Sequence, residues 1–323
     1  MPLVFAAIAP HGDLAIPEAC SLEQRSLAAG TQAGMRELER RCRAANPEVI
    51  VVLTPHGIHV TGSIAVVIAG HATGSLEEAP EPIDLDLETD LPLAHATIDA
   101  LRGEGVPVVG VSFGGNVPAE AVMPMDWGTL IPLWYLGGRW EPPRRIVVVA
   151  PARDLPAATH VSAGVAIGRA AAVSAHRIAL IASADQAHTH DAAGPYGVHP
   201  SARIYDEIAA SAVRESDLGR LLDVSARLLE DAKPDSWWQM LMLHGALNAT
   251  GGAPGASNAP GAPAATAAPS STGPQGATGA WRGELLSSEA PTYYGMLCAA
   301  FVPLGGSEDP VRPGQDGSVQ NEG

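Results

Sequence analysis

Two apolar runs of the sequence end in the same three residues, Pro-His-Gly. The first, FAAIAPHG, ends at His11 and Gly12, and the second, VVLTPHG, ends at His56 and Gly57. A short aliphatic and β-branched run that stops at Pro and Gly is typical of a strand buried on both faces of a sheet. Each histidine is therefore predicted at the carboxyl end of a strand, where open parallel sheets bind their ligands.

Strand-like and helix-like segments alternate along the chain. Strands are predicted at residues 3–9, 49–53, 64–69, 108–113, 146–149 and 178–182, and helices at residues 22–45, 92–102, 161–175, 201–212 and 218–229. This alternation predicts a single α/β domain with a mostly parallel central sheet flanked by helices and an active site at the strand carboxyl ends. The segment IDLDLE at residues 83–88 alternates apolar and acidic residues, which predicts an edge strand with solvated carboxylates.

Two segments are predicted to lie outside this domain. Residues 249–280 are nearly all Ala, Gly, Pro, Ser and Thr, and residues 305–323 are polar and rich in Pro and Gly. Such compositions bury too little apolar surface to offset the entropy of ordering, so a disordered insertion and a disordered tail are expected. The catalytic domain is then residues 1–248 together with residues 281–304, which carry the apolar and aromatic residues of a packed strand or helix.

Charge and cysteine content narrow the class of protein. The net charge is -16 and the 19 Lys and Arg residues are scattered, so neither a nucleic acid nor an anionic membrane is an expected partner. The 3 cysteines are widely spaced and odd in number, which suits free thiols in a reducing compartment. Pro10 breaks the first apolar run, so neither a signal peptide nor a membrane anchor is expected there. A cytoplasmic location is predicted.

The repeated Pro-His-Gly suggests a metal site. A lone histidine at a strand end is more often structural, but if the two strands are neighbours, about 5 Å apart, His11 and His56 reach one point above the sheet edge. Two imidazoles and one carboxylate form the facial triad of non-haem Fe(II) enzymes. His59 is a weaker candidate, because Pro55 and Gly57 oppose a helix that would align it with His56.

Several stretches together resemble the class III extradiol ring-cleavage dioxygenases, of the protocatechuate 4,5-dioxygenase catalytic-subunit type. They are APHG, TPHG, MDWGTLIPLWYLG at residues 125–137, SADQAHTHDAAGPYG at 183–197 and WWQMLMLHGAL at 237–247. The resemblance runs from Ala9 to about Leu247 and resumes over residues 289–301. It implies an Fe(II) enzyme that binds a catechol or aminophenol and splits the neighbouring C–C bond with both atoms of O₂.

The resemblance also implies roles for individual residues. It makes His11 and His56 iron ligands and His188, at the end of SADQAH, an acid/base that takes a phenol proton and later returns it. His190 is the alternative for that role, and either residue is otherwise a solvated loop histidine.

The third metal ligand departs from the family pattern, which has a Glu before the last helix. Here that region reads LLEDAKPDSWWQMLMLHGAL. Asp235 is favoured because Pro234 marks a break before an apolar helix, while Asp231 and Glu230 remain alternatives and Gln239 lacks the charge. Asp235 has a plain structural alternative as the cap of that helix.

A second departure lies in Asp126-Trp127-Gly128, where relatives often carry Asp-His-Gly. Trp127 is neither a base nor an acceptor, but its indole can stack on a substrate ring or donate one hydrogen bond. Tyr196 and Tyr294 are further candidates for the pocket wall, with ordinary packing as the alternative.

Two other kinds of function stay open. One keeps the fold without oxygen chemistry, as a zinc-binding protein or an inactive partner subunit, and the other is a non-enzymatic binding protein. A carboxylate near His11 and His56 favours the dioxygenase. Expected partners are a small aromatic diol or aminophenol, O₂, and either further copies of this chain or a related subunit.

Overall fold

The computed structural model describes residues 2–77, 79–251 and 281–304. Most of the predicted insertion at 249–280 and the whole predicted tail at 305–323 lie outside these residues. The first three residues of the predicted insertion, 249–251, end helix α7 (Trp237–Gly251). No helix within the described ranges combines the length and apolarity needed to cross a membrane.

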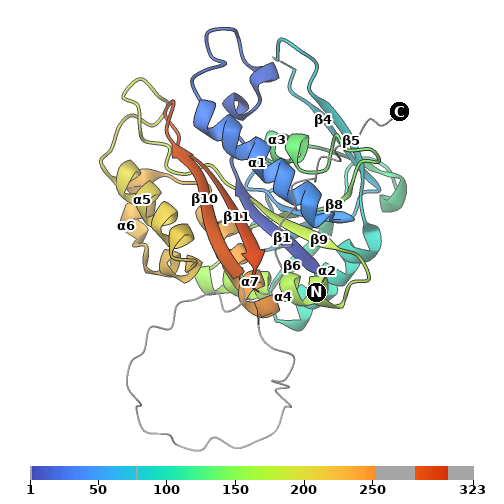
Figure 1. The fold of residues 1–323 in the computed structure, drawn as a ribbon. Coiled ribbons are helices and arrows are strands. Elements are labelled where there is room, and N and C mark those ends of the chain that lie inside the picture. Colours follow the sequence, from blue (N-terminus) through green and yellow to red (C-terminus); the bar gives the residue numbers. More distant parts are fainter. Residues whose placement is uncertain (1, 78, 252–280, 305–323) are drawn as a thin grey trace, which may run out of the picture.

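An eight-stranded sheet forms the centre of the molecule, in the order β10-β11-β1-β9-β2-β8-β3-β6 (Figure 1). Its strands are β1 (Leu3–Ala9), β2 (Val49–Leu53), β3 (Ile64–Val67), β6 (Val108–Val111), β8 (Arg145–Ala150), β9 (Ile178–Ser183), β10 (Trp281–Glu289) and β11 (Met296–Pro303). The central four, β1, β9, β2 and β8, pair in parallel, whereas β11 runs antiparallel to β1 and β3 antiparallel to β8. The predicted α/β fold with a mostly parallel sheet is confirmed.

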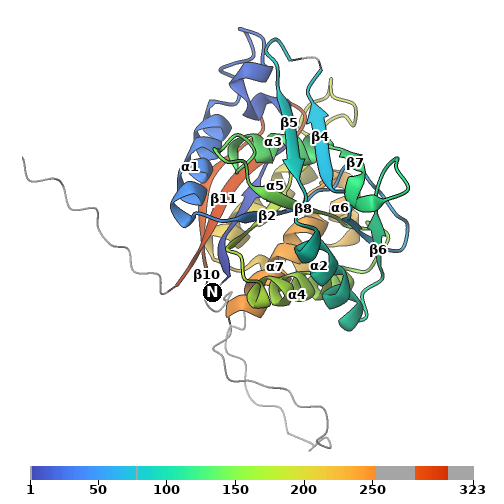
Figure 2. The same ribbon diagram turned by 90° about the vertical axis from the view of Figure 1, so that its right-hand side faces the viewer.

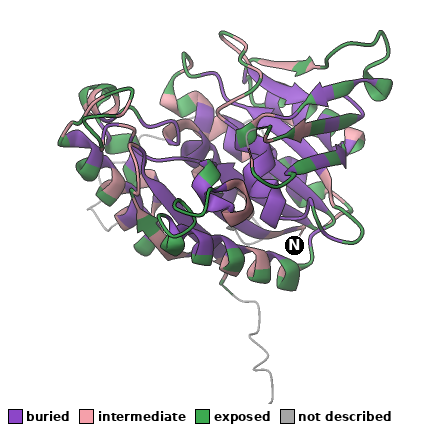
Figure 3. Cartoon of the chain, turned by 90° about the horizontal axis from the view of Figure 1, so that it is seen from above, coloured by how far each residue is buried: buried purple, intermediate pink, exposed green. Residues whose placement is uncertain are grey.

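Helices cover both faces of the sheet. On one face lie α2 (Leu91–Gly103), α4 (Ala157–Val173), α5 (Ser201–Arg214), α6 (Ala226–Ala232) and α7, and on the other lie α1 (Ala29–Ala45) and α3 (Trp127–Tyr135). Along β2, Val49, Val51 and Leu53 join the first core, and Ile50 and Val52 join the second. Burial on both faces explains why the strands are continuous apolar runs; in Figure 3 the central strands are buried and the outer helix surfaces exposed.

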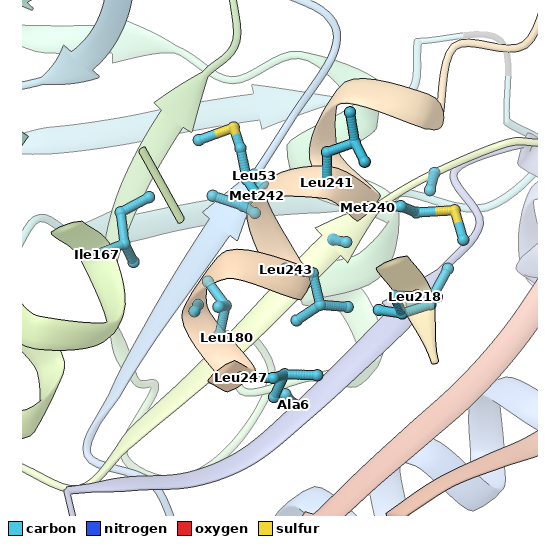
Figure 4. Close-up of a cluster of buried hydrophobic side chains, with 14 of the residues drawn as sticks. Ala6, Leu53, Ile167, Leu180, Leu218, Met240, Leu241, Met242, Leu243 and Leu247 are labelled. Atoms are coloured by element: carbon cyan, nitrogen blue, oxygen red, sulfur yellow. The ribbon is translucent and has the colours of Figure 1, made fainter. Parts of the chain in front are cut away.

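Helix α7 packs its apolar residues directly onto the first face. Met240, Leu243 and Leu247 lie there beside Ala6 of β1 and Leu180 of β9 (Figure 4). Because α7 is apolar nearly all round, it is buried between the sheet and α4. This packing fixes the start of α7, where Asp235 lies, relative to the strands.

A small second sheet stands beside α3 (Figure 2). It consists of β4 (His71–Ser75), β5 (Asp84–Glu88) and β7 (Val122–Pro124), in the order β5-β4-β7. In β5 the two leucines are buried while the three acidic residues are exposed, which confirms the predicted solvated edge strand.

Some predicted boundaries differ from the structure. The helix predicted at 22–45 begins only at Ala29, because residues 22–28 form turns before it. The helix predicted at 218–229 is two pieces, a 3-10 helix at Leu218–Asp223 and then α6, which begins where the Ser225 hydroxyl accepts from the Leu228 amide. Residues 281–304 return to the body as the β10–β11 hairpin. Three further 3-10 helices lie at Asp13–Ala15, Pro17–Ala19 and Pro118–Glu120.

Candidate metal centre

His11 and His56 meet above the carboxyl end of the sheet, although their strands are not neighbours. The condition considered from sequence, that β1 and β2 be neighbours, is not met, because β9 lies between them and pairs with both. The Nε2 atoms of the two histidines are nevertheless 3.1 Å apart, with the rings edge to face. The loops that follow the two strands therefore bring the imidazoles across the end of β9.

Asp235 completes a cluster of three. Its Oδ2 lies 3.2 Å from Nε2 of His11 and 3.2 Å from Nε2 of His56. The carboxylate does not cap α7, because Oδ2 faces the histidines and Oδ1 is buried without a hydrogen-bond partner among the described residues. Within the described ranges, only these three residues form a group that could hold a metal ion.

The dimensions of this triangle fit one metal ion. Adjacent ligands of a six-coordinate ion with bonds of about 2.1 Å lie about 3 Å apart, close to the three separations found here. The carboxylate of Asp235 is buried, and its Oδ1 has no hydrogen-bond partner among the described residues. A buried negative charge needs a positive partner, which is a further sign that a cation belongs between these groups. His11, His56 and Asp235 could therefore hold a divalent ion and leave the remaining positions open.

The other candidate ligands lie apart from this triangle. Asp231 forms an ion pair with Arg227 on α6, and Glu230 is exposed. Gln239 is buried, but its amide donates to the backbone carbonyls of Ser183 and Asp235 and so ties the start of α7 to β9. His59 is exposed.

Ser183, at the end of β9, sets the proton position on His11. Its hydroxyl donates to the carbonyl of Gly128, so it must accept from His11, whose Nδ1 lies 3.0 Å away. Nδ1 then carries the proton, and the lone pair of Nε2 points at the triangle, as metal binding requires. The sequence hypothesis did not include Ser183, which appears in the sequence only as the last residue of an apolar strand.

Asp126 holds the loop that carries His56. Its carboxylate accepts from the Thr54 hydroxyl at 2.8 Å and from the amide and hydroxyl of Thr129, and it caps α3. Gly57 has φ +74° and packs so closely on Asp126 that a Cβ atom there would come within 2.7 Å of Oδ2. The glycine of this Pro-His-Gly is therefore required both by its backbone conformation and by its contact with Asp126.

The first Pro-His-Gly needs its glycine for another reason. A Cβ atom on Gly12 would lie 2.4 Å from the ring of Tyr294. The loop after β1 can thus pass beside Tyr294 only without a side chain at this position, and His11 keeps its place above β9.

Asp185 is a second buried carboxylate at the centre. Its Oδ1 accepts from the His11 amide at 3.0 Å, and its Oδ2 lies 3.6 Å from His11 Nε2. Burial lowers the pKa of His11, but the charges of Asp185 and Asp235 outweigh it and raise that pKa to about 9. Burial raises the pKa of Asp185, whereas for Asp235 the charge and hydrogen bonds of His11 outweigh burial and lower the pKa. Asp185 was not among the residues predicted for the site, although it lies in the SADQAH segment.

His188 faces the centre from the loop after β9. Its Nδ1 lies 2.9 Å from the Gln186 carbonyl, which only accepts, so Nδ1–H donates and Nε2 is free to take a proton. That Nε2 lies 3.8 Å from Oδ2 of Asp235. His190, the alternative, instead bonds Asp206 at 2.7 Å, and Asp206 also accepts from the amide of Ala187.

Aromatic side chains line a cavity of about 1090 Å³ that opens above the centre. Trp127 is 51% exposed and lies over His56, with ring centroids 4.4 Å apart. Tyr196 is 54% exposed, and Tyr294 is buried and stacks with His188 at 5.9 Å. The three predicted aromatic residues thus line one cavity, together with Tyr293, which the sequence analysis overlooked beside Tyr294.

Comparison with known proteins adds a family and a fold. The family described as the catalytic LigB subunit of aromatic ring-opening dioxygenase matches residues 6–266. Protein CA_C1420 of Clostridium acetobutylicum is 21% identical over 200 residues, which are 61% of this chain and only 42% of that longer protein. The crystal structure of the uncharacterized protein JW3007 of Escherichia coli K12 has a similar fold, with a TM-score of 0.57, 16% identity, and coverage of 92% of this chain and 99% of that one.

Proposed function

Since this chain belongs to the family of catalytic LigB subunits of aromatic ring-opening dioxygenases, we propose that it cleaves the ring of a catechol or aminophenol with O₂ at an Fe(II) ion. The extradiol position, next to the two ring substituents, is part of the proposal. The observation that carries it is the triangle of His11, His56 and Asp235, which has the ligand types and spacing of a two-histidine, one-carboxylate iron site.

The ion would be held by these three side chains. When bound, it would lower the pKa of a coordinated phenol and provide open positions at which the substrate and O₂ come together. A carboxylate beside the two histidines is also the feature that favours this function over a related protein without oxygen chemistry.

His188 is the proposed acid/base. With Nδ1–H committed to the Gln186 carbonyl, its Nε2 accepts the proton of the second ring hydroxyl and returns it to the product. Its position beside Oδ2 of Asp235 places Nε2 within reach of a group bound at the triangle. Tyr294, stacked with His188, is kept as a neutral phenol because burial raises its pKa, and its hydroxyl donates to Asp13, which holds the ring in place beside His188.

The aromatic walls position the ring and limit access of water. Trp127 stands over His56 on one side, and Tyr196 and Tyr293 stand near His188 on the other. A flat ring of catechol size fits between such faces.

We also propose the cytoplasm as the location, because the three cysteines are separate, buried thiols. The proposed partner is a second copy of this chain or a related subunit.

Metal analysis of paired variants tests this function. Protein purified without oxygen should contain Fe(II) and consume O₂ when catechols or aminophenols are added. His11→Ala should lose iron and activity together. His188→Phe should keep its iron while turnover falls by about 10² to 10⁴, the usual contribution of a positioned acid/base.

Two results would contradict the proposal. Tight binding of zinc without O₂ uptake on any ring substrate would favour a zinc protein of the same fold. Equal loss of iron in the His11 and His188 variants would make His188 a ligand instead of an acid/base.

A further inference from the structure

The cavity above the metal centre has an unbalanced set of charges. Among the described residues that line it, five are acidic and none is Lys or Arg. The nearest arginine in sequence to a lining residue, Arg25, forms an ion pair with Glu81. A ring substituent that enters this cavity therefore meets negative groups without a basic side chain to balance them.

Three of the five carboxylates belong to the metal centre or to the start of α3. Asp235 and Asp185 face His11, and Asp126 caps α3 and bonds Thr54. Because Asp126 occupies the N-terminal amides of α3, that helix end does not offer an anion site either.

The other two acidic residues, Asp13 and Glu77, could contact a substituent of a bound ring. Asp13 is exposed and accepts through Oδ1 from the amide of Leu14 at 3.0 Å and from the hydroxyl of Tyr294 at 3.3 Å, so it lies one aromatic ring away from His188. Glu77 is exposed on the loop between β4 and β5. Both carboxylates lie on the cavity wall but outside the metal triangle.

The aromatic residues of the cavity wall also favour a positively charged substituent. The rings of Tyr196 and Tyr293 pack edge to face beside His188, with centroids 6.4 Å apart, and both line the cavity. Aromatic faces attract ammonium groups and offer nothing to a carboxylate. The acidic residues and the aromatic rings thus favour one kind of substituent.

We infer that the preferred substrate is a catechol whose side chain carries an ammonium group, and that carboxylated catechols are disfavoured. This inference rests on the proposed function, because it assumes that the ring binds at the triangle. An anionic substituent would face Asp13 and Glu77 without compensation, whereas an ammonium group would be attracted by these carboxylates and by the tyrosine faces.

Three probes with the same ortho-diol test this inference. Dopamine, ethylcatechol and dihydroxyphenylacetate have side chains of similar length and carry a positive, no and a negative charge. Their Kd values are measured without oxygen on the iron-loaded protein, from the change in tryptophan fluorescence. Dopamine should bind most tightly and dihydroxyphenylacetate least, on the order of tenfold apart, and added salt should narrow the difference.

Charge-neutralising variants assign the effect to the cavity. In the double variant Asp13→Asn and Glu77→Gln, the ratio of the ethylcatechol Kd to the dopamine Kd should shrink several-fold. Glu88→Gln removes one negative charge from the exposed face of β5, outside the cavity, and should leave all three Kd values unchanged.

The outcomes separate this inference from the proposed function. Equal binding of the three probes, or tighter binding of dihydroxyphenylacetate, would overturn the charge preference and leave the dioxygenase proposal intact. Failure of all three probes to bind the iron-loaded protein would overturn both.

Discussion

Ser183 shows how one residue outside the metal triangle controls a ligand. Because it accepts from Nδ1–H of His11, it leaves Nε2 as the nitrogen that binds the metal once His11 is neutral. Ser183→Ala removes this acceptor, so the affinity for the ion should fall on the order of 10- to 100-fold. Competition with a chelating dye measures the change, and Ser211→Ala, at a half-buried position of α5 away from the metal centre, is the control. Unchanged affinity would show that another group fixes the His11 tautomer.

Asp206 is expected to position His188 without touching the substrate. It holds both the amide of Ala187 and the ring of His190, on either side of His188. Asp206→Ala should lower turnover on the order of tenfold or more and shift the pH profile, while iron content stays the same. Asp206→Asn keeps an acceptor for the Ala187 amide and should recover part of the rate. Iron loss in Asp206→Ala would instead indicate a general loss of structure.

At the scale of elements, α4 and α7 form a contact that only glycine allows. A Cβ atom on Gly164 would lie 1.9 Å from the carbonyl oxygen of Met242, and one on Gly245 would lie 2.1 Å from that of Val161. The two helices therefore approach backbone to backbone. Since Asp235 lies at the start of α7, this contact also fixes the third member of the metal triangle.

A single methyl group should separate these helices. Gly164→Ala should lower the free energy of unfolding by about 1 to 3 kcal/mol, the usual cost of overpacking, and weaken metal binding. Gly103→Ala is the matched control on α2, because a Cβ atom there meets nothing within 4 Å and alanine is the better helix former. Thermal unfolding with and without metal measures both effects. Equal stability of Gly164→Ala and the parent protein would show that the helices can move apart freely.

The elements were predictable from sequence where the chain is periodic. Strands β1 and β2 match their predicted bounds because each is one apolar run closed by Pro and Gly. The order of the strands was not predictable, since nothing in the runs says that β9 inserts between β1 and β2. The break before α6 was also missed, because it depends on the Ser225 cap and not on the apolar pattern.

The candidate site was predictable only in part for the same reason. His11, His56 and His188 stand out because they end distinctive segments. Ser183 and Asp185 do not, since their contacts with His11 span more than 170 positions in sequence. Asp235 was favoured over Asp231 because of the break at Pro234, but the direction of each side chain depends on how α6 and α7 pack.

At the scale of the whole molecule, the metal centre joins segments that are far apart in the chain. His11 follows β1, His56 follows β2 and Asp235 precedes α7. An ion that binds all three stabilises only the folded state, so it should raise the Tm, and a chelator should reverse the gain.

The stability of the metal-free protein and the affinity for the metal ion should change with pH in opposite directions. The pKa of His11 rises from 6.5 to about 9 on folding, so its proton stabilises the metal-free fold fully below pH 6.5 and this contribution is lost as the pH rises toward 9. The full loss is at most about 3 kcal/mol. Because a metal ion must displace the same proton, metal affinity should increase over that range.

Melting curves between pH 6.5 and 8.5 test this prediction. Burial raises the pKa of Cys42 and Cys298 to about 12, so these thiols destabilise the fold only at a pH above that at which an unfolded thiol ionises, about 8.5. The range therefore ends at pH 8.5. The Tm of chelator-treated protein should fall by several degrees across this range, and the gain in Tm on adding Fe(II) without oxygen should grow. His11→Asn removes the titrating group, so its metal-free Tm should lose this slope; if the slope persists in His11→Asn, the proton that stabilises the metal-free fold resides elsewhere.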